Sequence, residues 1–196
     1  MAKNKEIVGS PKGSRSVRRT KMALRNSLIE LMKTRSILRI SITEICEEAD
    51  VGRSTFYAHY ENQYDLLEEL EMDCLSAFEE TLSMNQPLRK YNNQEVTKIF
   101  ERMLQFIADN NNSIQILLNE NGEVLFQRKF INHLIGYFKY AKKMYADGFD
   151  EKTSECYSVF FINGALALIQ HWLKNNMHIP VHVLAKMLLS LTSGMR

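Results

Sequence analysis

Apolar residues recur along most of this chain at intervals of three and four positions, the period of an amphipathic α-helix. No stretch shows the strict alternation of apolar and polar residues that is typical of a strand. The pattern predicts an all-α protein. Its longer helices are expected at residues 17–34, 63–83, 93–109, 113–119, 123–146, 152–175 and 181–193, with two short helical segments between residues 41 and 62.

Residues that end or cap helices lie in the gaps between the expected helices. These residues are 85–87, 110–112, Gly122, 147–148 and Pro180. The chain contains three prolines and eight glycines, so long helices are left uninterrupted. This punctuation agrees with the apolar period and supports the all-α prediction.

The first short segment begins with a capping box, in which Ser41 and Glu44 bond each other's backbone N–H groups. A helix is therefore expected to start at Ile42. Ile42, Ile45 and Ala49 form one apolar stripe, while the glutamates of this segment lie towards the solvent. We interpret this segment as a packing helix.

A tight turn over residues 49–52 leads into the second short segment. Gly52 is expected to supply the unusual backbone conformation of the turn and to cap the next helix. Phe56 and Tyr60 share one face of that helix and can anchor it. Its remaining surface carries Arg53, Ser54, Thr55, Tyr57, Ala58 and His59.

Two helices joined by a short turn form the plan of a helix-turn-helix DNA reader. The exposed residue types suit a DNA groove, because Arg can bond guanine with two donors and Ser or Thr can bond a base or a phosphate. Small side chains would also let the helix enter the groove deeply. A helical hairpin that never meets DNA is the alternative interpretation.

The segment before these helices is strongly basic. Residues 1–26 hold eight basic residues and one acidic residue, a net charge of +7, whereas the whole chain carries +2 and the remainder therefore −5. Such an asymmetry orients a molecule towards a polyanion. We expect a disordered basic arm at residues 1–16 and phosphate contacts from Arg18, Arg19 and Lys21; a solubilising tail is the plainer alternative.

Other classes of protein find little support in the sequence. The longest apolar stretch, 159–173, is shorter than the roughly 20 residues of a membrane-spanning helix. There is no apparent export signal, and three widely spaced cysteines suit reduced thiols, so a cytoplasmic protein is expected.

Catalytic motifs are also missing: we find neither a glycine-rich phosphate loop nor a nucleophile elbow. We therefore expect neither enzymatic activity nor a cofactor. His171, His178 and His182 lie close in sequence, but Pro180 separates the last two, so no metal site is predicted.

The segment from Ser41 to Leu67 resembles the DNA-binding motif of the TetR family of transcriptional regulators. The matching residues are Ala49, Val51, Thr55, Phe56, Tyr57, His59, Tyr60, Leu66 and Leu67, preceded by a helix with Arg18, Arg19, Leu24, Leu28 and Leu31. Two positions depart from the family pattern. Asp50 stands where glycine is usual, and Gln63 stands where a phosphate-contacting lysine is usual, so weaker phosphate binding is expected at Gln63.

The resemblance implies a DNA-binding domain over residues 17–62 and a helical regulatory and dimerisation domain over 63–196. It further implies a homodimer that binds a palindromic operator in double-stranded DNA as a repressor released by an effector. The alternatives are a DNA-binding coregulator controlled by a partner protein and a transcriptional activator. The last two long helices are the expected dimer interface, with Phe160, Gly164, Leu168, Trp172, Leu184 and Leu188 as candidates. An intramolecular core made of the same residues is the alternative.

The resemblance also implies an effector pocket. Its candidates combine apolar and polar side chains: Met103, Phe106, Phe126, Phe130, His133, Tyr137, Asn163 and Gln170. Taken one by one, these residues are better explained as plain core. Residues 172–180 resemble the carboxy-terminal region of TetR-like regulators of dihydroxyacetone kinase type, which leaves both a small molecule and a partner protein open as the effector.

Overall fold

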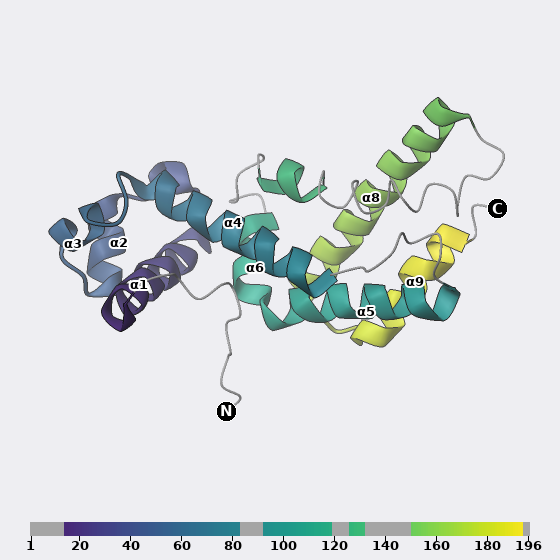
Figure 1. Ribbon diagram of the computed structural model, residues 1–196, viewed down its shortest axis with the longest axis horizontal. Helices are drawn as coiled ribbons and strands as arrows, with labels where there is room; N and C mark the ends of the chain where they lie inside the picture. Colours follow the sequence, from purple (N-terminus) through teal and green to yellow (C-terminus); the bar gives the residue numbers. More distant parts are fainter. Residues whose placement is uncertain (1–13, 83–91, 119–125, 132–149, 194–196) are drawn as a thin grey trace. The chain divides into compact units, whose positions relative to one another are not determined.

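The computed structural model of the protein describes residues 14–82, 92–118, 126–131 and 150–193. Within these ranges every regular element is a helix and none is a strand (Figure 1). The predicted all-α fold class is confirmed.

The helices follow the predicted pattern closely. They are α1 (Arg15–Met32), the 3-10 helix η1 (Ile37–Arg39), α2 (Ile42–Ala49), α3 (Arg53–Tyr57), α4 (Gln63–Leu82), α5 (Asn93–Asp109), α6 (Asn111–Leu118), α8 (Glu151–Lys174) and α9 (Val181–Ser193). Residues 126–131 are also helical. The predicted helices 93–109 and 181–193 are confirmed at both ends; η1 was not predicted.

Differences at the other ends have local causes. α1 begins two residues early because the Ser14 hydroxyl caps it, accepting the Val17 N–H at 3.4 Å, so the predicted arm ends before residue 16. Asn110 alone separates α5 from α6, which therefore starts at Asn111. Residues 1–13, the predicted break at 85–87 and most of the predicted helix 123–146 lie outside the described residues.

The chain forms two compact units, whose borders differ from the predicted domains. Unit 1 comprises the described residues of Met1–Ala77 and Asp109–Phe126, and unit 2 those of Phe78–Ala108 and Gln127–Arg196. Most of α4 thus belongs to unit 1 and not to the second domain. The reason is burial, since α4 contributes Leu66, Leu67, Leu70 and Cys74 to the core of unit 1.

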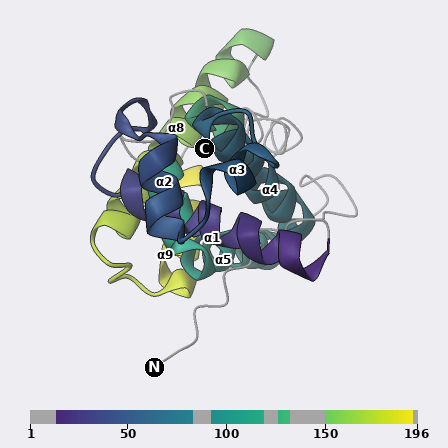
Figure 2. The same cartoon turned by 90° about the vertical axis from the view of Figure 1, so that its left-hand side faces the viewer.

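Unit 1 is built around α1, which packs against α2 and α6, while α2 packs against α3. Figure 2 shows α1, α2, α3 and α4 from the left-hand side of Figure 1. Fully buried apolar side chains join these helices: Leu24, Leu28, Met32, Ile37, Ile45, Phe56, Leu66, Ile114 and Leu117. Burial of each such side chain contributes about 1.5–3 kcal/mol, which holds the short α3 in place.

Unit 2 has an aromatic core. The Phe78 ring lies 5.6 Å from that of Phe106 and 5.0 Å from that of Phe130, between ring centroids. Trp172 near the end of α8 is 1% exposed, and its indole N–H donates to the Ile179 carbonyl at 2.7 Å. This hydrogen bond ties α8 to the turn that leads into α9.

Candidate DNA-binding surface

The turn between α2 and α3 takes its shape from Asp50. Asp50 has φ 52° and ψ 45°, a left-handed conformation, and its N–H donates to the Cys46 and Glu47 carbonyls. Gly52 is extended, with φ −66° and ψ 144°, and is the N-cap of α3 as predicted. The prediction that Gly52 supplies the unusual conformation is therefore wrong. Aspartate is one of the few residues that visit the left-handed region readily.

The start of α2 is held by the predicted capping box. The Glu44 carboxylate accepts the Ser41 N–H at 2.9 Å, and the Ser41 hydroxyl accepts the Glu44 N–H at 3.3 Å. Arg35 also donates to Glu44, at 2.6 Å. The Arg35 and Ser41 hydrogen bonds lower the pKa of Glu44 to about 2, so this carboxylate is charged and matched by a cation at neutral pH.

In α3, one buried ring anchors a helix whose other side chains face outward. Phe56 is fully buried, and its ring contacts Tyr57 edge-on at 5.8 Å and Tyr60 at 5.6 Å. The structure brings most of the predicted DNA-contacting set onto one solvent-facing surface: Arg53, Ser54, Thr55, Tyr57 and Ala58 are exposed, while His59 and Gln63 are half-buried.

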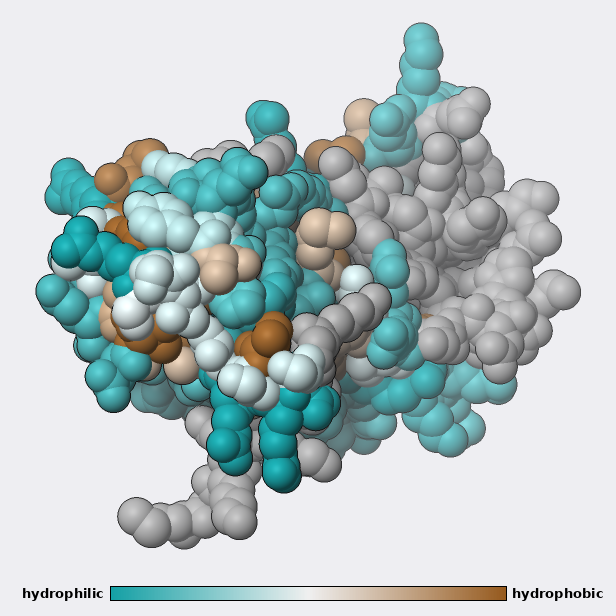
Figure 3. Space-filling view, turned by 60° about the vertical axis from the view of Figure 1, so that its left-hand side comes forward, coloured by the Kyte–Doolittle hydropathy of each residue, from teal (hydrophilic) through white to brown (hydrophobic). Residues whose placement is uncertain are grey.

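The surface at this end of the protein is mainly hydrophilic. In the space-filling view, hydrophobic groups occur here in separate patches between hydrophilic ones (Figure 3). The exposed large apolar side chains of unit 1 are Met22, Leu38, Tyr57, Tyr64 and Met72. Sequence reasoning missed Leu38 and its exposed neighbour Arg39, because nothing in the apolar period indicates the η1 turn that presents them.

On α1, the predicted phosphate contacts divide into two kinds. Arg18 and Arg19 are exposed and make no ion pair with any described residue. Lys21 instead pairs with Glu69 of α4 at 2.8 Å, and its ammonium group lies 5.1 Å from the centre of the Tyr60 ring. The structure thus gives Lys21 an internal partner, which Arg18 and Arg19 lack among the described residues.

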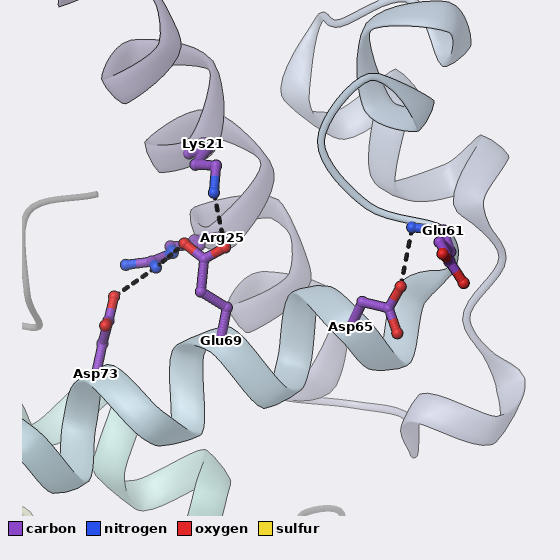
Figure 4. Close-up of polar contacts among 6 residues, drawn as sticks. All are labelled: Lys21, Arg25, Glu61, Asp65, Glu69 and Asp73. Carbon is purple, nitrogen blue, oxygen red and sulfur yellow. Dashed lines mark hydrogen bonds and ion pairs between the residues drawn. The ribbon is translucent and has the colours of Figure 1, made fainter. Parts of the chain in front are cut away.

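Lys21 belongs to a polar cluster, which we call the α1–α4 clamp: Lys21, Arg25, Glu69 and Asp73 (Figure 4). The Arg25 side chain is 4% exposed and donates to both carboxylates. Burial opposes the charge on Arg25, yet Asp73 and Glu69 raise its pKa. Burial likewise opposes the charge on Glu69, and its pKa is still lowered by the bonds from Lys21 and Arg25. The clamp joins α1 to α4 within unit 1.

The predicted effector residues do not all face one interior. Met103, Phe106, Phe126 and Phe130 are buried, and Phe106 and Phe130 belong to the aromatic core of unit 2. Asn163 is exposed, and its amide donates to the Val159 carbonyl at 2.8 Å, so the prediction that it lines a pocket is not carried further. Gln170 is half-buried. His133 and Tyr137 lie outside the described residues.

The predicted interface residues divide between the core and the surface. Trp172, Leu184 and Leu188 are at most 1% exposed within one chain, which favours the intramolecular core, the alternative interpretation, for these three residues. Phe160 is 68% exposed, Gly164 is exposed and Leu168 is half-buried. On α9 the exposed apolar residues are instead Val183, Met187 and Leu191.

Among the helices that the structure describes, one meets the length and composition of a membrane span. The stretch Glu155–Lys174 of α8 has 20 residues and a mean hydropathy of 1.3. This is weak support for a span, because a core helix has the same composition. Here Ile162, Leu166 and Ile169 are buried in unit 2.

Comparison with known proteins agrees with this geometry. Residues 26–70 match the family model for bacterial regulatory proteins of the tetR family, and residues 94–194 match the model for a transcriptional regulator C-terminal region. No curated protein matches the chain.

Two solved structures are similar in fold. One is a TetR transcriptional regulator from Streptococcus agalactiae 2603V, with 24% identity and a TM-score of 0.66 over 91% of this chain and 96% of that one. The other is the dihydroxyacetone kinase operon activator DhaS, with 16% identity and a TM-score of 0.56 over 89% and 94%. Together with the family model that spans half of the chain, the helix-turn-helix geometry shows that this protein belongs to the TetR family and is a DNA-binding transcriptional regulator.

Proposed function

We propose that the protein is a homodimeric cytoplasmic repressor that binds a palindromic operator through α3 and leaves it when an effector binds. Regulators of the TetR family bind DNA as dimers, often bind small effectors and are generally not enzymes. Beyond these family properties, the proposal specifies a palindromic operator, repression as the sign of regulation, and the residues that contact DNA and the effector.

The observation that carries the proposal is the outward-facing surface of α3. Its anchor, Phe56, is buried, whereas Arg53 and Tyr57 point to solvent without an ion pair among the described residues. Guanidinium, hydroxyl and methyl groups on one short helix can bond base edges in the major groove. This combination of exposed side chains on α3 therefore favours a helix that reads DNA.

Support for a homodimer comes from unit 2. Phe160 on α8 and Val183, Met187 and Leu191 on α9 are apolar and between 38% and 68% exposed. A side chain added at Gly164 would meet nothing within 4 Å, so this position leaves room for close approach of another helix. Two such helices from each protomer can form a four-helix bundle across a two-fold axis.

Release from DNA would follow from differential affinity. An effector that binds better to a state with mis-spaced α3 helices weakens operator binding by the same factor by which DNA weakens effector binding. We propose Met103, Phe106 and Phe130 as the apolar part of the effector-responsive core. Their burial supports this role, and α4, which runs from unit 1 into unit 2, is the proposed lever.

An activator controlled by a partner protein is the second candidate. It is favoured by the fold similarity to an activator, DhaS, and by the carboxy-terminal resemblance at residues 172–180. Transcription in vitro separates the two candidates. With a selected palindrome placed over a promoter, a repressor lowers the rate of transcript formation; a rise in that rate, with the palindrome upstream of the promoter, would favour the activator.

A further inference from the structure

An open hollow of about 470 Å³ lies beside α3 in unit 1. It is formed by η1, the start of α2, one side of α3 and the start of α4. Its lining residues are Leu38, Arg39, Ile40, Ser41, Ile42, Thr43, Arg53, Tyr57 and Gln63. Arg39 was not among the residues that the sequence analysis proposed for DNA contact.

The hollow is cationic. Arg39 and Arg53 line it, and no Asp or Glu does. Neither arginine makes an ion pair with a residue in the described ranges. Two other hollows differ in this respect: the neighbouring one, beside Cys46, includes Glu47 and Asp50, and one in unit 2 between α5 and α9 includes Glu95 and Glu101. Only the first of these three presents positive charge without a carboxylate in its lining.

The carboxylate next in sequence to the lining is already matched by a cation. Glu44, next to the lining residue Thr43, accepts a hydrogen bond from Arg35 at 2.6 Å and from the Ser41 hydroxyl at 2.7 Å. Arg35 does not line the hollow, so Glu44 is matched by a cation outside it. Arg53 also borders the neighbouring hollow with Glu47 and Asp50, whereas Arg39 lines only the first of the three hollows. An anion that enters the hollow therefore meets a net positive field.

The position of the hollow identifies the anion. Arg53 and Tyr57 belong both to the hollow and to the exposed surface of α3. When a recognition helix enters the major groove, the first helix of the motif crosses the phosphate backbone, and the start of α2 is part of this lining. A phosphate at the edge of the groove would therefore lie where Arg39 is presented.

We propose that this hollow binds one phosphate of the DNA backbone and that Arg39 is its principal cation. This inference rests on the proposed reading of DNA by α3. Gln63 lies in the same lining and carries only a neutral amide. Arg39 thus supplies, from η1, the positive charge that the first residue of α4 does not carry.

The experiment measures the salt dependence of DNA affinity for Arg39→Gln, by fluorescence anisotropy with a labelled duplex. Loss of one phosphate contact lowers the slope of log affinity against log salt by about 0.9 and weakens binding about fivefold at 0.15 M salt. The loss should be equal for specific and non-specific duplexes, because a phosphate contact carries no sequence information. Arg102→Gln, which removes an exposed arginine from α5, is the charge-matched control and should keep the wild-type slope.

A second variant tests whether the two residues share one site. Adding Gln63→Lys to Arg39→Gln returns a cation to the same lining and should restore the slope. An unchanged slope for Arg39→Gln, in a protein that keeps the wild-type unfolding temperature and binds DNA, would overturn the proposal. Failure of Gln63→Lys to restore the slope would overturn the assignment to this hollow.

The two proposals can fail separately. If the wild-type protein selects no palindrome but Arg39→Gln still lowers the slope on any duplex, the phosphate site stands and the operator-reading repressor fails. If a palindrome is selected and the Arg39→Gln slope is that of wild type, the repressor stands and the phosphate site fails.

Discussion

The helices α3 and α9 are both anchored by buried apolar side chains, but their exposed faces carry different residue types. Each helix buries apolar side chains against its own unit, Phe56 for α3, and Leu184 and Leu188 for α9. On α3 the exposed side chains are Arg53, Ser54, Thr55 and Tyr57, whereas on α9 they include the aliphatic Met187 and Leu191. The first face suits a polyanion and the second suits another apolar helix. The difference shows that exposure alone does not identify a site; the residue types that are exposed decide the partner.

The two surfaces should also respond differently to salt. Binding of α3 and Arg39 to phosphates releases counterions and weakens as salt rises. Association through α9 buries apolar area and should depend little on salt. Variants that act on only one surface can therefore be recognised.

The largest effect is expected when the apolar face of α9 is charged. Met187→Glu with Leu191→Glu should convert the dimer to a monomer, since two carboxylates would be desolvated in the bundle. Affinity for a palindrome should fall by about 10²- to 10⁴-fold, because the second half-site no longer binds intramolecularly. Sedimentation gives the oligomeric state and anisotropy gives the affinity. Gln94→Glu, which adds a charge at an exposed position of α5, is the control. A double variant that stays dimeric would contradict the interface.

The next largest effect is expected on α3. Arg53→Ala or Tyr57→Ala should each lower operator affinity by about 1–3 kcal/mol, the usual value of a good base contact. Both side chains are exposed, so the dimer and its unfolding temperature should not change. Glu48→Ala, an exposed change on α2, is the control. Unaltered affinity in both α3 variants would mean that α3 does not read DNA.

The α1–α4 clamp should matter for stability. Arg25→Met leaves the Glu69 and Asp73 carboxylates without their buried partner and should lower the free energy of unfolding by about 2 kcal/mol. Lys33→Met breaks an exposed pair with Glu30 and should cost no more than about 0.5 kcal/mol. Urea denaturation compares the two variants. Equal losses would show that the clamp is no stronger than a surface ion pair.

A smaller effect is expected from pH. The pKa of Glu44 is lowered from 4.5 to about 2. Its stabilising contribution is therefore complete above pH 4.5 and is lost as the pH falls towards 2. Glu44→Gln should flatten this part of the stability profile, measured by thermal unfolding between these pH values. Arg35→Ala should have the same effect, because its hydrogen bond is the main cause of the shift; profiles identical to wild type would contradict the pairing.

The smallest effect is expected on α1. Arg19→Ala should lower the salt slope of DNA binding by up to about 0.9 if Arg19 holds a phosphate. Lys21→Ala should leave the slope unchanged, because Lys21 is bonded to Glu69. The two variants remove the same charge from neighbouring positions. A slope lowered only by Lys21→Ala would reverse these assignments.

The elements of the DNA-binding end could be predicted because local rules determine them. Ser41 and Glu44 fix the start of α2, and the spacing of Phe56 and Tyr60 fixes which face of α3 is buried. Asp50 could not be identified as the left-handed residue, because glycine is the usual choice and Gly52 lies nearby. The η1 turn that presents Arg39 is set by packing and has no sequence period of its own.

The carboxy-terminal predictions were less exact because burial there depends on tertiary packing. Apolar period alone does not separate Leu184, which faces the core, from Leu191, which faces solvent. The same limit explains why Asn163, a polar residue in an apolar stretch, was expected inside and lies outside. The border of unit 1 lies within α4, between Ala77 and Phe78, and a continuous helix gives no sign of it.

The most direct test of the central claim is selection of bound sequences from a random duplex pool at two salt concentrations. A symmetric reader with α3 as recognition helix should enrich a palindrome, with half-sites whose centres are separated by about 34 Å or a multiple of it. Arg53→Ala should change the bases enriched in each half-site. Salt-sensitive binding without enrichment, or enrichment identical in Arg53→Ala, would contradict the account.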